Sequence, residues 1–312
     1  MILCISYLYD NPNIDNIDEW LGYNADTLQY TDEKACIFPK KSVPLYAKTN
    51  NYIMEKYTKR YTLTADEMDN NYRMNQHAYL LYFQDTFARY FGHLHMAAFD
   101  LAKDNKLFVI TEMSIDMLPV EVFWADDIEV TMWVSELSSV RIVSDYCFHK
   151  VRTGELLAKG SSTWCLINAQ TRRLERIDPY FDRITVVPEM MTETHKKQVF
   201  PIGGEELLQV EHKVNLLDLD FNGHVNNRRY LAIAMLTSTN DFLTDFRTKR
   251  MVIHWMRETY RDDTIHCTLR KIQQGEYVHT LTNHAGQTVA EIYSIWEPRT
   301  DTGDVCEMVC RE

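Results

Sequence analysis

The polar side chains with the clearest capacity for chemistry gather in one short segment, Asp218–Asn227, with the sequence DLDFNGHVNN. Asp220, Asn222 and His224 alternate in this segment, immediately before an apolar stretch. Histidine titrates near neutral pH, so His224 can act as a general base or can orient another group. Asp and Asn also cap helices frequently, so a purely structural role for Asp220 and Asn222 stays open on spacing alone.

The apolar stretch predicts a helix that begins within this segment, and the start of a helix has chemistry of its own. The first N–H groups of a helix lack partners inside the helix and carry the positive end of its dipole. We expect the N–H groups of Val225 and Asn226 to form an oxyanion hole, because they would face a carbonyl oxygen as it becomes negative.

An earlier part of the chain repeats this arrangement, which indicates a duplicated unit. Two of the repeated residues, Gly154 and Gly286, each lie in a hairpin-like turn between two stretches that alternate in hydrophobicity. Three pairs of motifs match in the same order: Asn75-x-His77 with Asn222-x-His224, Asp126-Asp127 with Asp262-Asp263, and Gly154, Ala158 and Trp164 with Gly286, Ala290 and Trp296.

Hydrophobic periodicity predicts the elements that position these motifs. The first unit has a strand near 57–63, a helix over about 76–91 and strands near 107–117, 128–137, 140–150 and 156–168. The second has a strand over 210–216, a helix over about 225–238 and strands near 250–257, 264–273, 276–283 and 288–296.

Both helices are apolar around most of their circumference, so each must be buried on nearly every side. A buried helix wrapped by a curved antiparallel sheet is the hot-dog arrangement, and the chain is therefore predicted to be an α+β protein with two hot-dog units in tandem. Pairing the two sheets edge to edge would hide two exposed strand edges.

The predicted organisation has five parts. Residues 1–53, rich in Asn, Asp and Tyr, form an irregular extension, and residues 54–180 form the first unit. Residues 181–205 are a linker, 206–298 the second unit and 299–312 a tail.

Composition excludes several classes of protein. The 312 residues have a formal net charge of −12, which argues against nucleic acid as a partner. No apolar run approaches the roughly 20 residues of a membrane span. No Lys or Arg precedes Lys34, so the start resembles neither a secretory signal nor a transit peptide.

Seven scattered cysteines predict a reducing, cytoplasmic location. Cys306-x3-Cys310 lacks the second pair of ligands that a zinc site needs, so we expect neither a metal nor a cofactor.

The segment Asp218–Asn227 resembles the active-site motif of the plant and bacterial acyl-acyl carrier protein (ACP) thioesterases, and the matching positions are Asp220, Asn222 and His224. That family has a catalytic glutamate further along, in an Arg-Glu pair before a polar turn, and Glu258 matches it. The resemblance covers roughly residues 55–298.

The resemblance implies hydrolysis of fatty acyl-ACP to free fatty acid, which ends fatty acid synthesis. Glu258 and His224 would activate water, Asn222 would position the water or the thioester, and Asp220 would fix the loop. Many family members have a Cys after the glutamate, whereas this chain has Thr259. Water attack and a Glu258 anhydride therefore both stay open.

Two further sets of residues are predicted from chemistry and position. The acyl chain is expected beside the first helix, although plain core packing is the better explanation for any single residue, and the candidates are Tyr79, Phe83, Met113, Met117, Met132 and Trp133. A basic patch is expected to meet the acidic carrier, and its candidates are Arg172, Arg173, Arg176, Arg228 and Arg229.

Other hypotheses remain. The same chemistry would serve an acyl-CoA thioesterase, and a hot-dog tunnel without catalysis would make an acyl sensor. Either a monomer or a homodimer is compatible with the sequence. We expect only the second unit to be catalytic, because Arg73 stands where the match to Asp220 should be and Glu121 lies one residue out of register with Glu258. His77 would then be structural.

Overall fold

The computed structural model describes residues 55–69, 72–192 and 197–299. The predicted extension at 1–53, most of the predicted tail and the pair Cys306 and Cys310 lie outside these residues. No helix within the described ranges is long and apolar enough to cross a membrane.

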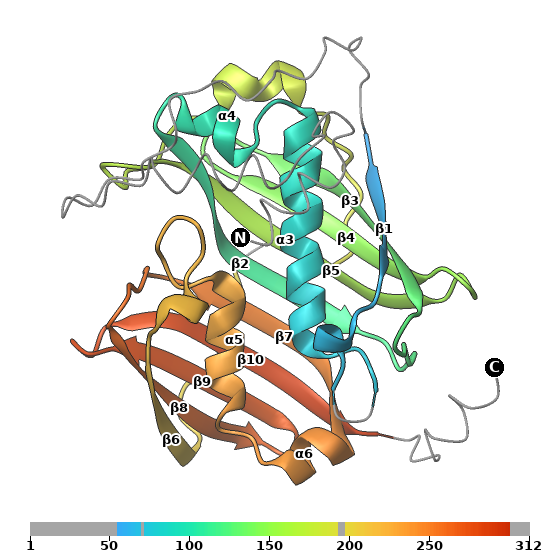
Figure 1. Ribbon diagram of the computed structural model, residues 1–312, viewed down its shortest axis with the longest axis vertical. Coiled ribbons are helices and arrows are strands. Elements are labelled where there is room, and N and C mark those ends of the chain that lie inside the picture. Colours follow the sequence, from blue (N-terminus) through green and yellow to red (C-terminus); the bar gives the residue numbers. More distant parts are fainter. Residues whose placement is uncertain (1–54, 70–71, 193–196, 300–312) are drawn as a thin grey trace, which may run out of the picture.

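The first unit consists of a long helix against five strands (Figure 1). Its strands and helices are β1 (Tyr57–Thr62), α3 (Gln76–His93), α4 (Ala98–Ala102), β2 (Lys106–Met117), β3 (Asp127–Leu137), β4 (Ile142–Lys150) and β5 (Leu156–Asn168), with short 3-10 turns η1 (Ala65–Glu67) and η2 (Asp178–Arg183).

The second unit repeats this order with a shorter helix. Its elements are β6 (Glu205–Lys213), η3 (Leu216–Asp218), α5 (Asn227–Met235), α6 (Asn240–Asp245), β7 (Phe246–Trp255), β8 (Thr264–Gln273), β9 (Glu276–Asn283) and β10 (Thr288–Pro298).

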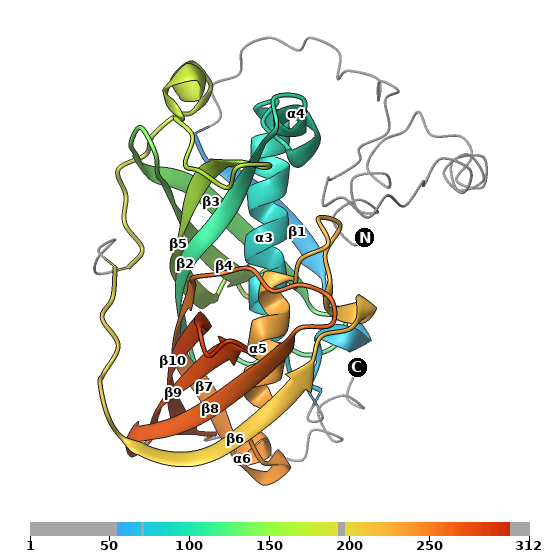
Figure 2. The ribbon, with the colours of Figure 1, turned by 90° about the vertical axis from the view of Figure 1, so that its left-hand side faces the viewer.

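All ten strands form one antiparallel sheet in the order β1-β3-β4-β5-β2-β7-β10-β9-β8-β6. The units join where β2 pairs with β7, from Glu112 opposite His254 to Asp116 opposite Arg250. Figure 2 shows the curved sheet with α3 and α5 on its concave face. The predicted edge-to-edge pairing of two helix-and-sheet units is confirmed.

The core of the first unit fills the space between α3 and the sheet. Phe83 is fully buried on α3, 4.1 Å between ring centroids from Tyr146 and 5.4 Å from Phe148. Gly160 on β5 permits this close approach, since a Cβ there would lie 2.8 Å from Cζ of Phe83 and 2.4 Å from the carbonyl oxygen of Ser114. The helix therefore lies directly on the strand, with no room for a larger residue.

The segment between the units crosses the outer face of the sheet. The indole N–H of Trp133 donates to the carbonyl oxygen of Glu189 at 2.8 Å, and the N–H of Met191 donates to the buried carboxylate of Asp145 at 2.7 Å. Residues near 189–191 thus cover polar groups on the face opposite the helices.

The structure differs from the predicted elements at helix ends and at the first strand of the second unit, which was expected over 210–216 but spans Glu205–Lys213. The second helix was expected over 225–238 but spans Asn227–Met235, because the side chain of Asn226 accepts the N–H of Arg228 and starts the helix there. Short helices α4 and α6 were not predicted, since five or six residues are too few to establish a helical period.

Candidate active site

The loop that carries Asp220, Asn222 and His224 is shaped by the Asp220 carboxylate. Its Oδ1 accepts the N–H of Asn222 at 2.8 Å and, more weakly, that of His224 at 3.4 Å. The N–H of Asp220 in turn donates to the carbonyl oxygen of His224 at 2.8 Å. Gly223 has a φ of +76°, a conformation that glycine adopts without strain. Asp220 therefore fixes the backbone from which Asn222 and His224 project.

A second aspartate, Asp218, connects this loop to the segment that precedes it. It is 5% exposed, contacts Nε2 of His212 at 2.9 Å and accepts the N–H of Asn215 at 2.9 Å. Its carbonyl oxygen accepts the N–H of Asn226 at 2.8 Å. Sequence reasoning did not assign Asp218 a role, although Asn215 three residues before it has the spacing of a capping box.

The structure brings His224 and Glu258 together from separate parts of the second unit. Nδ1 of His224 lies 3.4 Å from Oε1 of Glu258, in the loop that follows β7. Tyr260 completes the group, because its hydroxyl donates to Oε2 of Glu258 at 3.3 Å and its ring meets the His224 ring edge-on at a centroid distance of 5.0 Å. These polar contacts are long, as is common in active sites without substrate.

Tyr260 was not predicted as a site residue. It lies two positions after Glu258 in the extended segment before β8, and such positions share one face. That spacing was the only trace of it in the sequence.

Arg172 forms an ion pair with Oε1 of Glu258 and is contributed by the first unit, from the turn after β5. The sequence had suggested Arg172 for carrier docking, but its guanidinium lies against the candidate catalytic carboxylate. Glu258 thus has a histidine, a tyrosine and an arginine as neighbours.

The electrostatics of the site keep His224 neutral near pH 7. Burial lowers the pKa of His224, the attraction of Asp220 opposes this shift, and Arg172 adds to it. A neutral imidazole can accept a proton, whereas an imidazolium cannot. The arrangement can therefore deprotonate a water molecule, with Glu258 orienting the imidazole and stabilising its charge after proton transfer.

The expected oxyanion hole is contradicted. The N–H of Val225 donates to the carbonyl oxygen of Thr259 at 2.9 Å, and the N–H of Asn226 donates to that of Asp218 at 2.8 Å. Both groups precede the true helix start at Asn227, and backbone bonds of the loop occupy them.

Thr259 lies away from the polar cluster. Its side chain is fully buried, and its hydroxyl is 2.7 Å from that of Tyr230 on α5. Residues Glu258 and Thr259 therefore face opposite directions, the first toward His224 and the second toward the helix.

The residues suggested for the acyl chain divide between two faces of the sheet. Five of them belong to the buried core on the helix side: Tyr79, Phe83, Met113, Met117 and Met132. Trp133 does not, because neighbouring residues on a strand point to opposite faces. Its ring lies under the ammonium group of Lys56 on the outer face, at 4.1 Å, so its assignment to the acyl site was wrong. A cavity of about 50 Å³ opens beside Tyr79 and Met117.

The five arginines suggested for docking do not form one exposed patch. Arg173 and Arg176 are exposed, and Arg176 pairs with Asp178. Arg228 is half-buried, and burial together with its neighbour Arg229 lowers its pKa. Arg229 donates to the carbonyl oxygen of Leu217 at 2.8 Å and so supports the active-site loop.

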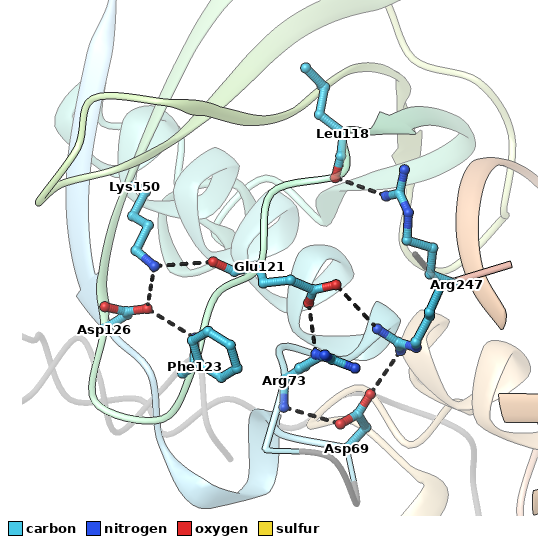
Figure 3. A network of polar contacts seen from close by, with 9 residues as sticks. Asp69, Arg73, Leu118, Glu121, Phe123, Asp126, Lys150 and Arg247 are labelled. Atoms are coloured by element: carbon cyan, nitrogen blue, oxygen red, sulfur yellow. Dashed lines mark hydrogen bonds and ion pairs between the residues drawn. The ribbon is translucent and has the colours of Figure 1, made fainter. Parts of the chain in front are cut away.

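The first unit contains a counterpart of this site, in a register that differs from the predicted one (Figure 3). The N–H of Arg73 donates to the Asp69 carboxylate at 3.0 Å, as that of His224 does to Asp220. Arg73 forms a β-bridge with Phe123, as His224 does with Tyr260.

The carboxylates of the two units match in the same way. Nε of Arg73 lies 3.2 Å from Oε2 of Glu121, where the second unit has the contact between His224 and Glu258. Glu121 is therefore in register with Glu258, and the predicted one-residue slip was wrong.

The structure corrects two of the motif alignments made from the sequence, the Asp-Asp alignment that led to the slip and the Asn-x-His alignment. The partner of Asp263 is Asp126, since each carboxylate accepts an N–H at 2.9 Å, from Tyr260 and from Phe123. Asn75 caps α3 and so corresponds to Asn226, which caps α5, and not to Asn222.

His77 does not correspond to His224 in the repeat. It lies in the first turn of α3, where burial and the nearby Arg228 and Arg229 lower its pKa to about 4. A histidine with this pKa is neutral near pH 7, and the His77 side chain is half-buried.

Comparisons with known proteins agree with this geometry. The pattern that describes the acyl-ACP thioesterase N-terminal domain matches residues 54–184, and that of the acyl-ACP thioesterase C-terminal domain matches residues 204–298. The chloroplastic acyl-[acyl-carrier-protein] hydrolase FATB3 of Cuphea viscosissima is 27% identical over 213 residues, which are 64% of this chain and 51% of that protein. The chloroplastic palmitoyl-acyl carrier protein thioesterase of Arabidopsis thaliana is 26% identical over 223 residues, covering 65% and 53%.

Solved structures show the same fold. An acyl-ACP thioesterase from Bacteroides thetaiotaomicron superposes with a TM-score of 0.68 at 16% identity, over 78% of this chain and 98% of that one. The 12:0-ACP thioesterase from Umbellularia californica gives 0.66 at 19%, over 78% and 97%. The double hot-dog fold is thereby confirmed. The chain spans about half the length of the curated relatives it matches. With both domain patterns matched in order over most of its length, it belongs to the acyl-ACP thioesterase family.

Proposed function

We propose that this protein hydrolyses the thioester of fatty acyl-ACP and releases the free fatty acid. The observation that carries the proposal is the contact of Nδ1 of His224 with Glu258 at 3.4 Å, beside a loop fixed by Asp220. The names of the relatives from Cuphea viscosissima and Arabidopsis thaliana supply the substrate class. Release of the fatty acid from its carrier would end chain elongation.

The proposed reaction begins with water beside His224. The imidazole, held through Nδ1 by Glu258, takes a proton on Nε2 while the water oxygen bonds to the thioester carbonyl carbon. The carbon–sulfur bond of the resulting tetrahedral species then breaks, and the leaving thiolate takes the proton from His224. Asn222 would orient the water or the carbonyl, since Asp220 holds both its N–H and, at 3.5 Å, its amide group.

A route through a Glu258 anhydride uses the same residues. The carboxylate would attack the carbonyl carbon and expel the thiolate, and water would then hydrolyse the anhydride. The half-buried Glu258 already faces a histidine and an arginine, which favours its service as an oriented carboxylate beside a base. Trapping of an acyl-enzyme on Glu258 by hydroxylamine would establish the anhydride route instead.

The acyl chain is proposed to lie along α3 of the first unit. The flexible side chains of Met113 and Met132 on the helix side of the sheet support this position. The small cavity beside Tyr79 and Met117 does not, because its lining also includes Asp69, Glu121, Arg247 and Arg299. The first unit, assigned to residues 54–180, would then select chain length, and the second, assigned to 206–298, would carry the hydrolytic residues.

The assay that tests the function measures thiol release from matched acyl-ACP and acyl-CoA series of varied chain length. We expect a higher kcat/KM for the ACP thioesters. A preference for CoA thioesters would move the assignment to an acyl-CoA thioesterase. Tight binding of acyl groups without thiol release would leave only an acyl sensor.

We also propose a reducing compartment, the cytoplasm, as the site of action. Cys147, Cys165 and Cys267 are free thiols in the part of the chain that the structure describes, as expected where disulfides do not form. Cell fractionation tests the location, since the relatives are named chloroplastic. Light scattering at several concentrations decides between monomer and homodimer.

A further inference from the structure

Each unit presents a carboxylate at the same position, and each carboxylate contacts an arginine that lies just after the last strand of the other unit. Glu258 of the second unit pairs with Arg172, which follows β5, the last strand of the first unit. Glu121 of the first unit lies 3.6 Å from Arg299, which directly follows β10, the last strand of the second unit. The two arginines are not equivalent positions of the repeat, because Arg172 lies four residues after β5 and Arg299 directly follows β10, but each connects the end of a unit's last strand to the glutamate of the other unit.

The contact at Glu121 has a structural role, because the charges of Glu121 and Asp69 are neutralised by those of Arg73 and Arg299. Arg299 is 9% exposed at its side chain and also pairs with Asp69 at 2.9 Å, while Arg73 occupies the position of His224. The contact at Glu258 lies instead beside His224, whose pKa is lowered by burial. The contact of Arg299 with Glu121 thus only joins the two units, whereas the contact of Arg172 with Glu258 also lies beside the proposed catalytic base.

The backbone around Arg172 is built to present this side chain. The carboxamide oxygen of Asn168 accepts the N–H groups of Gln170 at 3.1 Å and Thr171 at 2.9 Å, and its carbonyl oxygen accepts that of Arg172 at 2.9 Å. Arg172 has a φ of +58°, a left-handed conformation that non-glycine residues adopt rarely. Such conformations persist where surrounding contacts enforce them and are common at functional sites.

The alternative role for Arg172 is the one suggested by its charge, attraction of an acidic carrier. Its side chain is 32% exposed, and Nη1 donates to the carbonyl oxygen of Ala169 at 3.3 Å, so two of its contacts point inward. The adjacent Arg173 is exposed and is the better candidate for an encounter with a carrier. Variants of Arg172 and Arg173 can therefore distinguish a positioning role from a docking role.

We propose that Arg172 is a positioning residue, supplied by the first unit, that holds the Glu258 carboxylate in place for catalysis in the second unit. The proposal rests on the proposed hydrolase function. It makes the site composite: the loop and base come from the second unit, and the group that orients the carboxylate comes from the first. The guanidinium faces Oε1 of Glu258 and limits the directions in which the carboxylate oxygens can point.

The decisive variant is Arg172→Gly, since glycine suits a φ of +58° and the guanidinium is lost without backbone strain. We expect kcat for acyl-ACP to fall about tenfold or more with KM little changed, because Glu258 loses the group that orients it. The acid limb of the kcat profile should move to higher pH, because Arg172 lowers the pKa of the His224 base. Arg172→Lys, which keeps the charge, should recover part of kcat and move the acid limb back.

Two comparisons give the test its controls. Arg299→Ala removes the arginine that contacts Glu121 and should leave the acid limb of kcat in place while lowering the melting temperature. Arg173→Ala reports docking, which would appear in KM. Hydrolysis by the unaltered protein establishes the function separately; its absence would refute the hydrolase assignment and not the contact. With an active parent, a folded Arg172→Gly protein that keeps kcat and its acid limb, or one that matches Arg173→Ala by raising only KM, would overturn the positioning role.

Discussion

Arg73 occupies in the first unit the position that His224 occupies in the second. Each donates its N–H to an aspartate four residues earlier, and each faces a glutamate from the loop that follows a sheet strand. A guanidinium stays protonated throughout the physiological range, so it cannot act as a base, whereas an imidazole can. One substitution at a duplicated position therefore explains why a chain with two similar loops is expected to have one hydrolytic site.

The assignment predicts a large loss of turnover from changes in the second unit. We expect His224→Ala and Glu258→Gln each to reduce kcat about 10²-fold or more, because each removes part of the proton-transfer pair. Thiol release from acyl-ACP measures this effect, and circular dichroism checks that the variants are folded. Near-normal turnover in either folded variant would remove that residue from the mechanism.

His77→Ala is the matched control for these variants. His77 is a half-buried helix residue with a pKa of about 4 and is not the counterpart of His224, so the variant should keep most of the activity. Equal losses from His77→Ala and His224→Ala would indicate that His77 also takes part in hydrolysis, either in a second site or in one site shared with His224.

Chain-length preference should respond to Met132 and not to Trp133, although the two are adjacent in sequence. Met132 faces α3, whereas Trp133 faces the segment that crosses the outer face of the sheet. We expect Met132→Ala to shift the product profile toward longer acyl chains, because it enlarges the space beside the helix. Gas chromatography of released fatty acids measures the shift, and Trp133→Ala should lower stability with an unchanged profile. An altered profile from Trp133→Ala alone would place the acyl chain elsewhere.

The difference between these neighbours shows how far sequence reasoning reaches. Alternating hydrophobicity predicted nearly every strand, because burial of one or both faces dictates that pattern. It could not predict which face of β3 meets the helix, since Met132 and Trp133 are both large, apolar and fully buried. The outer face is buried by the segment near Glu189, which has no periodicity of its own.

The site residues that lie close together in sequence could be predicted, whereas a residue that reaches the site from a distant part of the sequence could not. Asp220, Asn222 and His224 are visible as a motif, and the resemblance supplied Glu258. Arg172 reaches Glu258 from the other unit, and only the folded sheet brings them together. The internal repeat was misaligned because Asn75 and His77 imitate Asn222 and His224 in sequence, whereas the hydrogen bonds equate Asn75 with Asn226.

Acid should destabilise the protein through a buried histidine far from catalysis. His279 on β9 is 2% exposed, and burial lowers its pKa from the ordinary 6.5 to about 4. The unfolded chain therefore binds this proton more tightly than the folded chain, so stability is intact above about pH 6.5 and falls as the pH drops toward 4. At about pH 5 the loss from this group is about 2 kcal/mol.

Urea unfolding at about pH 7.5 and about pH 5 measures this loss. His279→Gln keeps a polar partner for Thr237, whose hydroxyl is 3.1 Å from Nε2 of His279, but cannot bind the proton. The variant should lose less free energy of unfolding between the two pH values than the unaltered protein. An equal loss in both proteins would show that other groups cause the acid sensitivity.

Carrier docking is expected to depend on Arg173, the exposed neighbour of the arginine that holds Glu258. Charge reversal by Arg173→Glu should raise KM for acyl-ACP at low ionic strength and leave kcat largely intact, since docking charges steer encounter more than they affect the reacting groups. The difference should shrink as salt is added, because salt screens exposed charges. Arg152→Glu is the matched control: it makes the same change in net charge in the turn before β5, at the other end of the strand from Arg173. If both variants show the same KM and the same salt dependence, net charge alone governs the encounter and the carrier does not dock beside the turn that presents Arg172 and Arg173.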